Sequence, residues 1–220
     1  MRALVHPDVS AMLGRNVSCA TSEVRSSPLL PTGMPALDRA LEGGLPQGAM
    51  TEISGRGSAG RMTLALGVMA ERSRLGARVA WVDGRDRLDI SSVEAAGVVR
   101  KNFLWVRSHE PRKLKRSLCA AEILLDSRDF SVVTLDLVGG GRWRGGVKPA
   151  WWVRLGRKAA KTDTALLVLG DEGAVFGSAL RLDCKLSEQG ERGLLSVCFR
   201  WRRGVCGEVE EPLLVMPPMR

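Results

Sequence analysis

The stretch that decides the fold is Ala49-Met50-Thr51-Glu52-Ile53-Ser54-Gly55-Arg56-Gly57-Ser58-Ala59-Gly60-Arg61-Met62-Thr63. Residues 49–53 predict a strand, and the glycines from Gly55 to Gly60 predict a tight loop after it. A helix is expected from Met62 to Leu75, because apolar residues recur there at helical spacing and Gly76 follows as a helix-ending residue. Strand, glycine loop and helix in this order are the unit from which a parallel α/β sheet is built.

The same alternation continues along the chain. Further strands are expected at 79–83, 102–106, 131–137 and 164–169, and further helices at 90–96, 113–126 and 151–161. The ending differs, because residues 179–186 and 194–201 predict two antiparallel strands around a Gln189-Gly190-Glu191 turn. The sequence therefore predicts an α/β fold with a mainly parallel central sheet, covered on both faces, and a C-terminal antiparallel hairpin.

The domain organisation follows from composition. Apolar residues make up 45% of the 220 residues, which suits one domain with a single sizeable core. We expect this core to span residues 29–204. Residues 1–28, polar in their second part, are expected to form an N-terminal arm or linker, and residues 205–220, with three prolines, an irregular C-terminal tail.

Composition also limits the class of function. The five cysteines include no C-x-x-C pair, so neither a disulfide framework nor a metal site is expected. No apolar run approaches the ~20 residues of a membrane span, and the N-terminus lacks the long apolar segment of a signal peptide, so we expect a cytoplasmic protein without membrane contact. The formal charge of +9 attracts nucleic acid or acidic protein surfaces, unless it reflects arginine-rich composition alone.

The glycine loop at 55–60 is close to a phosphate-binding loop. The pattern for such a loop between a strand and a helix is G-x-x-x-x-G-K-[ST], and Gly55 and Gly60 match its glycines. Arg61 replaces the lysine, and arginine is longer and planar. Met62 replaces the hydroxyl that binds Mg²⁺, a cation that takes oxygen ligands. Thr63 offers a hydroxyl one position later, about 100° further around the helix, so we expect it to point elsewhere.

The residues around this loop resemble the RecA family of ATPases. The run Pro31–Gly48 (PTGMPALDRALEGGLPQG) leads into the loop strand as it does in that family. The likeness continues through 81–89, 132–136 and 164–169 and covers roughly residues 30–203. It implies a RecA-like P-loop core.

The resemblance also implies that the catalytic parts are missing. Arg85 stands where RecA-like ATPases carry the glutamate that activates water, and Gly170-Asp171 stands where recombinases carry a glutamine that senses the γ-phosphate. The acid of the Walker B strand is retained as Asp136, although Met62 cannot share a metal with it. The second DNA-binding loop is shortened to 172–177. We therefore expect a protein that is not an enzyme and has no cofactor.

Short RecA-like proteins with such eroded sites resemble the ImuA family. That family implies a role in the bacterial DNA-damage response, in mutagenic translesion synthesis through protein contacts. The implied partners are an ImuB-like Y-family protein, an error-prone C-family DNA polymerase and the recombinase RecA, whose filaments the protein would inhibit or cap. Three alternatives stay open: a cell-division inhibitor similar to SulA, a basic protein that binds single-stranded DNA, and a slow ATPase with atypical ligands.

A basic and aromatic segment takes the place of the first DNA-binding loop of recombinases. Two arginines flank a tryptophan between glycines, and a helix with a basic stripe follows. The candidate binding residues are Arg142, Trp143, Arg144, Lys148, Arg154, Arg157 and Lys158. Tryptophan can stack on bases while arginine holds phosphate, but the same residue types also dominate protein interfaces. A nucleic acid, a protein partner, and a solvated face without a partner all remain open.

Overall fold

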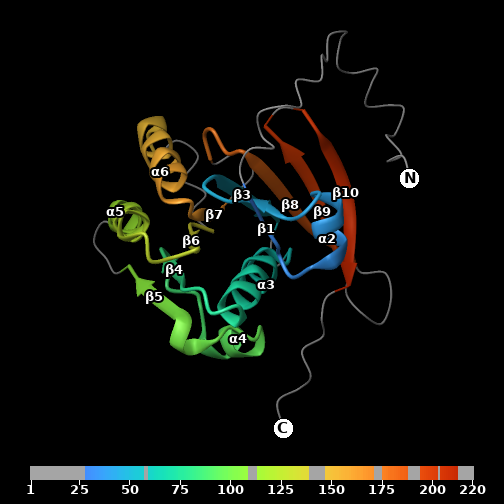
Figure 1. The fold of residues 1–220 in the computed structure, drawn as a ribbon, viewed down its shortest axis with the longest axis horizontal. Helices are drawn as coiled ribbons and strands as arrows, with labels where there is room; N and C mark the ends of the chain where they lie inside the picture. The colour runs from blue at the N-terminus through green and yellow to red at the C-terminus, as the bar shows by residue number, and fades with distance from the viewer. Residues whose placement is uncertain are drawn as a thin grey trace.

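The computed structural model describes residues 28–56, 59–108, 113–138, 147–170, 175–187, 194–202 and 204–212. Its centre is an eight-stranded sheet in the order β10-β9-β8-β3-β7-β6-β4-β5 (Figure 1). The strands are β3 (Met50–Gly55), β4 (Val79–Asp83), β5 (Phe103–Arg107), β6 (Val132–Asp136), β7 (Ala165–Leu169), β8 (Leu180–Ser187), β9 (Leu194–Trp201) and β10 (Cys206–Pro212).

Six of these strands run parallel to one another. β3 pairs in parallel with β7 and β8, and β4 does so with β5 and β6. β6 and β7 complete the parallel part, whereas β8, β9 and β10 pair with one another in antiparallel fashion. The expected α/β fold with a C-terminal antiparallel group is therefore confirmed.

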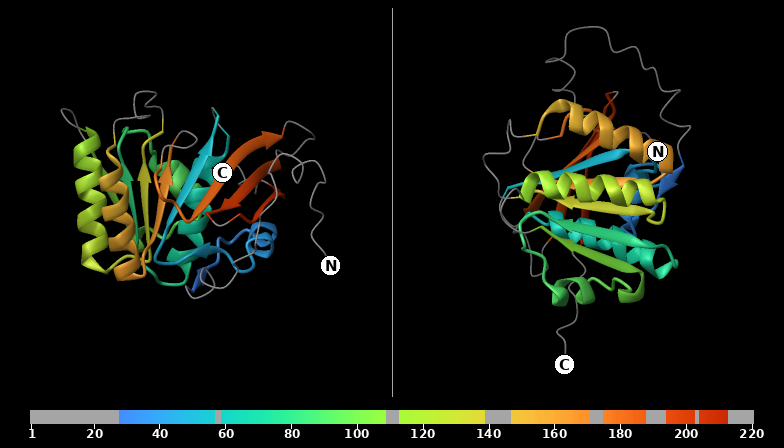
Figure 2. Two further views of the ribbon diagram at one scale, coloured as in Figure 1. Left: turned by 90° about the horizontal axis from the view of Figure 1, so that it is seen from above. Right: turned by 90° about the vertical axis from the view of Figure 1, so that its left-hand side faces the viewer.

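Helices cover both faces of the sheet. α3 (Arg61–Arg74) packs on one face in a core that also holds Trp81 of β4. α5 (Lys113–Ser127) and α6 (Pro149–Thr162) lie side by side on the other face (Figure 2). The short helices are α2 (Pro35–Ala40), α4 (Ile90–Ala95) and the 3-10 turn η2 (Arg100–Asn102). β1 (Leu29–Leu30) and β2 (Leu45–Pro46) form a separate two-stranded sheet that the sequence did not predict.

The prediction of an irregular tail at 205–220 is wrong for the first part of this segment, because Cys206–Pro212 form β10. Val209 packs against the core, whereas Glu208, the residue before it, is exposed, so the segment has the alternation of a strand at the edge of a sheet. Pro212 is the last residue of this edge strand, where a missing N–H is tolerated. The expected arm at 1–28 and the Gln189-Gly190-Glu191 turn lie almost entirely outside the described residues.

Candidate functional site at the carboxyl edge of the sheet

The two terminal glycines of the predicted loop lie on either side of its tip, at the end of β3 and before α3. Gly60 is left-handed, with φ +83°, and caps the N-terminus of α3. Gly55, at φ +152°, lies so close to β8 that a Cβ atom would come within 2.5 Å of the carbonyl oxygen of Cys184. Only glycine fits this position without a shift in the backbone. The two ends of the glycine loop, Gly55 and Gly60, therefore both have backbone conformations that suit glycine.

Arg61 points back into this loop. Its side chain is buried, with 9% of the residue exposed, and its Nη1 donates a hydrogen bond to the carbonyl oxygen of Gly55. The next residue, Met62, packs against the core formed with α3, whereas Thr63 is exposed. The loop cation is therefore engaged by the loop itself.

Two carboxylates lie side by side at the ends of β4 and β6. Asp83 and Asp136 are partners in the register of these strands, and both are buried. Burial raises the pKa of the Asp136 carboxyl from 3.8 to about 6, and the charge of Asp83 acts in the same direction. The backbone N–H of Val138, which donates to Asp136 Oδ1 at 3.0 Å, opposes this rise. Arg61 and Arg87 also oppose it through their positive charge.

Asp83 shapes the turn that follows β4. Its carboxylate accepts the backbone N–H groups of Arg85, Arg87 and Leu88, each at 3.0 Å to the nearer oxygen. These bonds stabilise the buried charge and fix the backbone of Arg85, whose side chain is half-buried. Asp83 was not among the predicted site residues, although an aspartate between a buried strand and Gly84 is a sign of such a turn.

An ion pair between buried Glu52 and half-exposed Arg181 holds Val175, which precedes β8. Glu52 of β3 is 1% exposed and lies 3.0 Å from Nε of Arg181 on β8, its partner in the register of the two strands. Glu52 Oε1 also accepts the N–H of Val175 at 3.3 Å, and Arg181 donates to the carbonyl oxygen of Val175 at 3.4 Å. This network ties the connection between β7 and β8 to the sheet. It was not predicted from the sequence, because its members are far apart in the chain.

The candidate binding segment is placed in part. Arg142, Trp143 and Arg144 lie outside the described residues, whereas Lys148 is exposed directly before α6. The role of all these residues stays a prediction.

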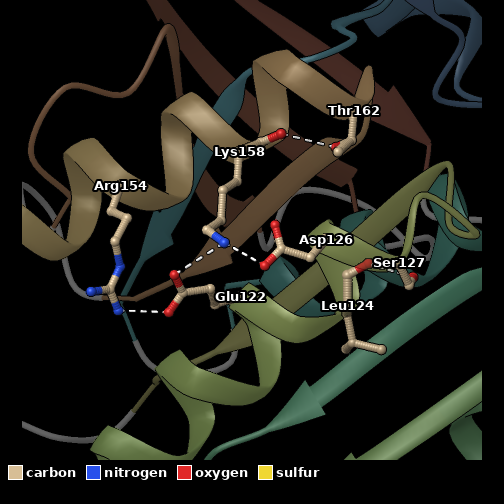
Figure 3. A network of polar contacts seen from close by, with 7 residues as sticks. All are labelled: Glu122, Leu124, Asp126, Ser127, Arg154, Lys158 and Thr162. Atoms are coloured by element: carbon tan, nitrogen blue, oxygen red, sulfur yellow. Dashed lines mark hydrogen bonds and ion pairs between the residues drawn. The ribbon is translucent and has the colours of Figure 1, made fainter.

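The basic stripe of α6 is not simply solvated (Figure 3). Arg154 pairs with Glu122 of α5 at 2.6 Å, and Lys158 bridges Glu122 and Asp126. Arg157 is exposed. Glu122 and Asp126 were not predicted as partners of this stripe, although their spacing of four residues matches that of Arg154 and Lys158.

Within the described ranges, no group of three or more histidine, cysteine, aspartate or glutamate side chains is arranged to hold a metal ion. In the same part of the chain, no helix combines the length and the apolar character needed to cross a membrane.

The fold and the carboxyl edge of its sheet define the class of this protein. It is a mainly parallel α/β domain with a glycine loop between a central strand and the following helix. A profile of the RecA N-terminal domain matches residues 12–142, more than half of the chain, and the chain belongs to this family.

The relatives of this chain include RecA proteins. Protein RecA of Desulfotalea psychrophila is 41% identical over 112 residues, which are 50% of this chain and 31% of that protein. Protein RecA of Symbiobacterium thermophilum is 39% identical over 127 residues, 57% of this chain and 34% of that protein. DNA repair protein recA homolog 3, mitochondrial, of Arabidopsis thaliana is 38% identical over 127 residues, 57% of this chain and 28% of that protein. The chain thus spans about a third of the length of these relatives.

Proposed function

We propose that this chain is a non-catalytic RecA-like accessory protein of the bacterial DNA-damage response, of the ImuA type. It acts in the cytoplasm and supports mutagenic translesion synthesis through contacts with an ImuB-like Y-family protein, an error-prone C-family DNA polymerase and the recombinase, whose filaments it inhibits or caps. The observation that carries the proposal is the buried guanidinium of Arg61, which is bonded to the carbonyl of Gly55 in its own loop.

The residues at the loop do not fit a magnesium–nucleotide complex. The buried guanidinium of Arg61 donates from Nη1 to the carbonyl oxygen of Gly55, and its planar group does not replace the compact ammonium of lysine at a tight phosphate site. The thioether of Met62 packs against the core and offers no oxygen ligand for magnesium. Arg85, whose backbone N–H donates to the carboxylate of Asp83, has a permanently charged side chain that cannot act as a general base. These features support a role in binding rather than in hydrolysis.

Titration calorimetry with Mg–ATP and a phosphate-release assay test the loss of nucleotide chemistry. We expect neither binding heat nor phosphate release from the unmodified protein. In the variant Arg61→Lys/Met62→Thr/Arg85→Glu we expect nucleotide binding to appear, because an ammonium group and a hydroxyl ligand are restored. Phosphate release by the unmodified protein that Arg61→Ala abolishes would establish the slow ATPase instead.

A pull-down from DNA-damaged cells tests the partner role, with the recombinase and both polymerase-type proteins probed together. We expect at least one of the three to be retained. Filament assembly and strand exchange by the recombinase are then measured with a molar excess of this protein, and we expect both to slow. If none of the three proteins is retained and the recombinase is unaffected, the accessory role is wrong.

Binding of single-stranded DNA is the second candidate function. The formal charge of +9 and the exposed Lys148, which follows the Arg142–Arg144 segment, favour it. Salt-dependent binding of an oligothymidine that is weakened by Arg142→Ala/Trp143→Ala/Arg144→Ala would support this function over the first.

A further inference from the structure

The two helical layers of the domain differ in charge. α5 and α6 together carry seven lysine and arginine residues and two carboxylates, a net charge of +5. The helices α2, α3 and α4 together carry four arginines and three carboxylates, a net charge of +1. The α5–α6 layer therefore carries a larger positive charge than the helices of the other layer.

Both carboxylates of the α5–α6 layer are already engaged. Glu122 accepts Arg154 and Lys158, and Asp126 accepts Lys158 (Figure 3). This pairing joins the two helices. Two further cations of α6, Arg157 and Lys161, are exposed. They share the outer stripe of α6 with Arg154, at spacings of three and four residues.

A large apolar side chain lies on the outer surface of α5. Ile123 directly follows Glu122 on α5 and is 68% exposed, more than any other large apolar side chain in the described residues. It lies three residues before Asp126, so both are on the outer surface of the helix. An exposed isoleucine in a basic layer has no use in holding a phosphate backbone, whereas it suits the apolar centre of a protein contact.

Trp151 is not free to stack on a nucleic-acid base. The guanidinium of Arg154 lies over its ring, 4.0 Å from the centroid, and Trp151 also packs against the core of this layer. Stacking on single-stranded nucleic acid requires an accessible aromatic face. The same contact instead fixes Arg154 in place, which lowers the entropic cost of its use in a protein interface.

We propose that the outer surface of α5 and α6, made of Ile123, Arg154, Arg157 and Lys161 (the α5–α6 face), binds an acidic segment of a partner protein. Carboxylates of the segment meet Arg157 and Lys161, while an apolar side chain of the segment covers Ile123. The proposal deepens the proposed function, on which it rests, because it gives the surface through which an accessory protein would hold its partner.

A labelled synthetic peptide tests this surface without a natural partner. The peptide is an amphipathic helix with glutamates on one face and leucines on the other; a version with glutamine for glutamate and an oligothymidine of equal charge are compared with it. Binding is followed by fluorescence anisotropy on the full chain at low and physiological salt. We expect the acidic peptide to bind most tightly and its affinity to fall with salt.

Two triple variants with the same change of charge distinguish this face from the rest of the molecule. Ile123→Ser/Arg157→Glu/Lys161→Glu alters the α5–α6 face. Leu75→Ser/Arg39→Glu/Lys101→Glu makes the same types of change at exposed positions on α2, η2 and the end of α3. Because charge reversal across an interface both removes attraction and adds repulsion, we expect the first variant to bind the peptide at least about tenfold more weakly, and the second within about twofold of the unmodified protein. Thermal unfolding verifies that both variants are folded.

Three outcomes overturn the proposal: no binding of the acidic peptide, equal weakening by both variants, or a loss of oligothymidine binding rather than peptide binding in the first variant. The last outcome would assign the face to nucleic acid. The same variants are then used with the recombinase and the two polymerase-type proteins. Peptide binding at this face without binding of any of the three would leave the surface established and the proposed function wrong.

Discussion

The phosphate loop and the α5–α6 face both contain arginines, but the Arg61 side chain is buried at the loop, whereas Arg154 and Arg157 are exposed on the α5–α6 face. At the loop, Arg61 is 9% exposed and its side chain donates a hydrogen bond to the backbone carbonyl of Gly55. Gly55 itself is packed against β8. On the α5–α6 face, the side chain of Arg154 is 49% exposed, and Arg157 is exposed as well. The cation at the start of α3 thus faces the protein, whereas the cations of α6 face the solvent, where a partner could meet them.

Replacement of Gly55 by alanine should have the largest effect, if the loop is held by close packing. The new Cβ would meet the carbonyl oxygen of Cys184 at 2.5 Å, and the φ of +152° is itself unfavourable for alanine. We expect the free energy of unfolding to fall by about 3 kcal/mol, measured by urea denaturation. Gly76→Ala is the matched control, because Gly76 has φ +83° but no atom within 4 Å of the position that a Cβ would occupy, so a loss of only about 1 kcal/mol is expected. Equal losses in the two variants would mean that the loop is not tightly packed.

Asp136→Asn should stabilise the protein, with a clear dependence on pH. Because the pKa of Asp136 is raised from 3.8 to about 6, the native state binds a proton more tightly than the unfolded state. The contribution of this group to stability is therefore highest below pH 4 and is lost as the pH rises through about 6, by up to about 3 kcal/mol for a shift of this size. Asparagine is uncharged and can still accept the N–H of Val138.

We accordingly expect Asp136→Asn to be more stable than the unmodified protein by about 2–3 kcal/mol at pH 7.5 and equal to it near pH 4, measured by urea denaturation at both values. Asp163→Asn makes the same change at the exposed end of α6 and is the control. A stabilisation that is the same at both pH values would mean that the charge of Asp136 is not the cause.

Most of the fold could be predicted from the sequence, because its strands are continuous apolar runs and its helices have clear apolar spacing. Val132–Asp136 and Ala165–Leu169 lie within the predicted strands. β10 escaped prediction because the prolines of the tail argue against a strand. The alternation of polar and apolar residues around Val209 is also short, because an edge strand needs apolar side chains on one face only, and it gave little signal in the sequence.

Less of the candidate site could be predicted. The motif identified Gly55, Gly60 and the substituted positions Arg61 and Met62, because local spacing determines a strand–loop–helix turn. It could not show that the Arg61 side chain bonds to the carbonyl oxygen of Gly55, since the direction of a side chain depends on packing that the motif does not contain. The pair of Glu52 and Arg181 and the pairs across α5 and α6 join residues distant in sequence, and only the pairing of strands and helices brings them together.

Glu122→Gln should have the smallest effect on stability and a distinct effect on binding. The substitution keeps the shape of the side chain but removes the charge that Arg154 meets at 2.6 Å. Ion pairs that remain partly open to water contribute little, so we expect a loss of at most about 1 kcal/mol in urea denaturation, which becomes smaller at high salt. Glu94→Gln, which breaks an exposed pair with Arg100, is the control and should lose no more than this.

Binding of the acidic peptide should change in the opposite direction in Glu122→Gln. Removal of the Glu122 carboxylate raises the net charge of the α5–α6 layer and leaves Arg154 available to a carboxylate of the peptide, so the peptide should bind more tightly. Glu94→Gln should leave the affinity for the peptide unchanged. A variant that is slightly less stable and yet a better binder is what outward-facing charge predicts. If the peptide binds Glu122→Gln more weakly, the ion pairs of this layer serve to hold α5 against α6, and the positive charge of the layer does not attract a partner.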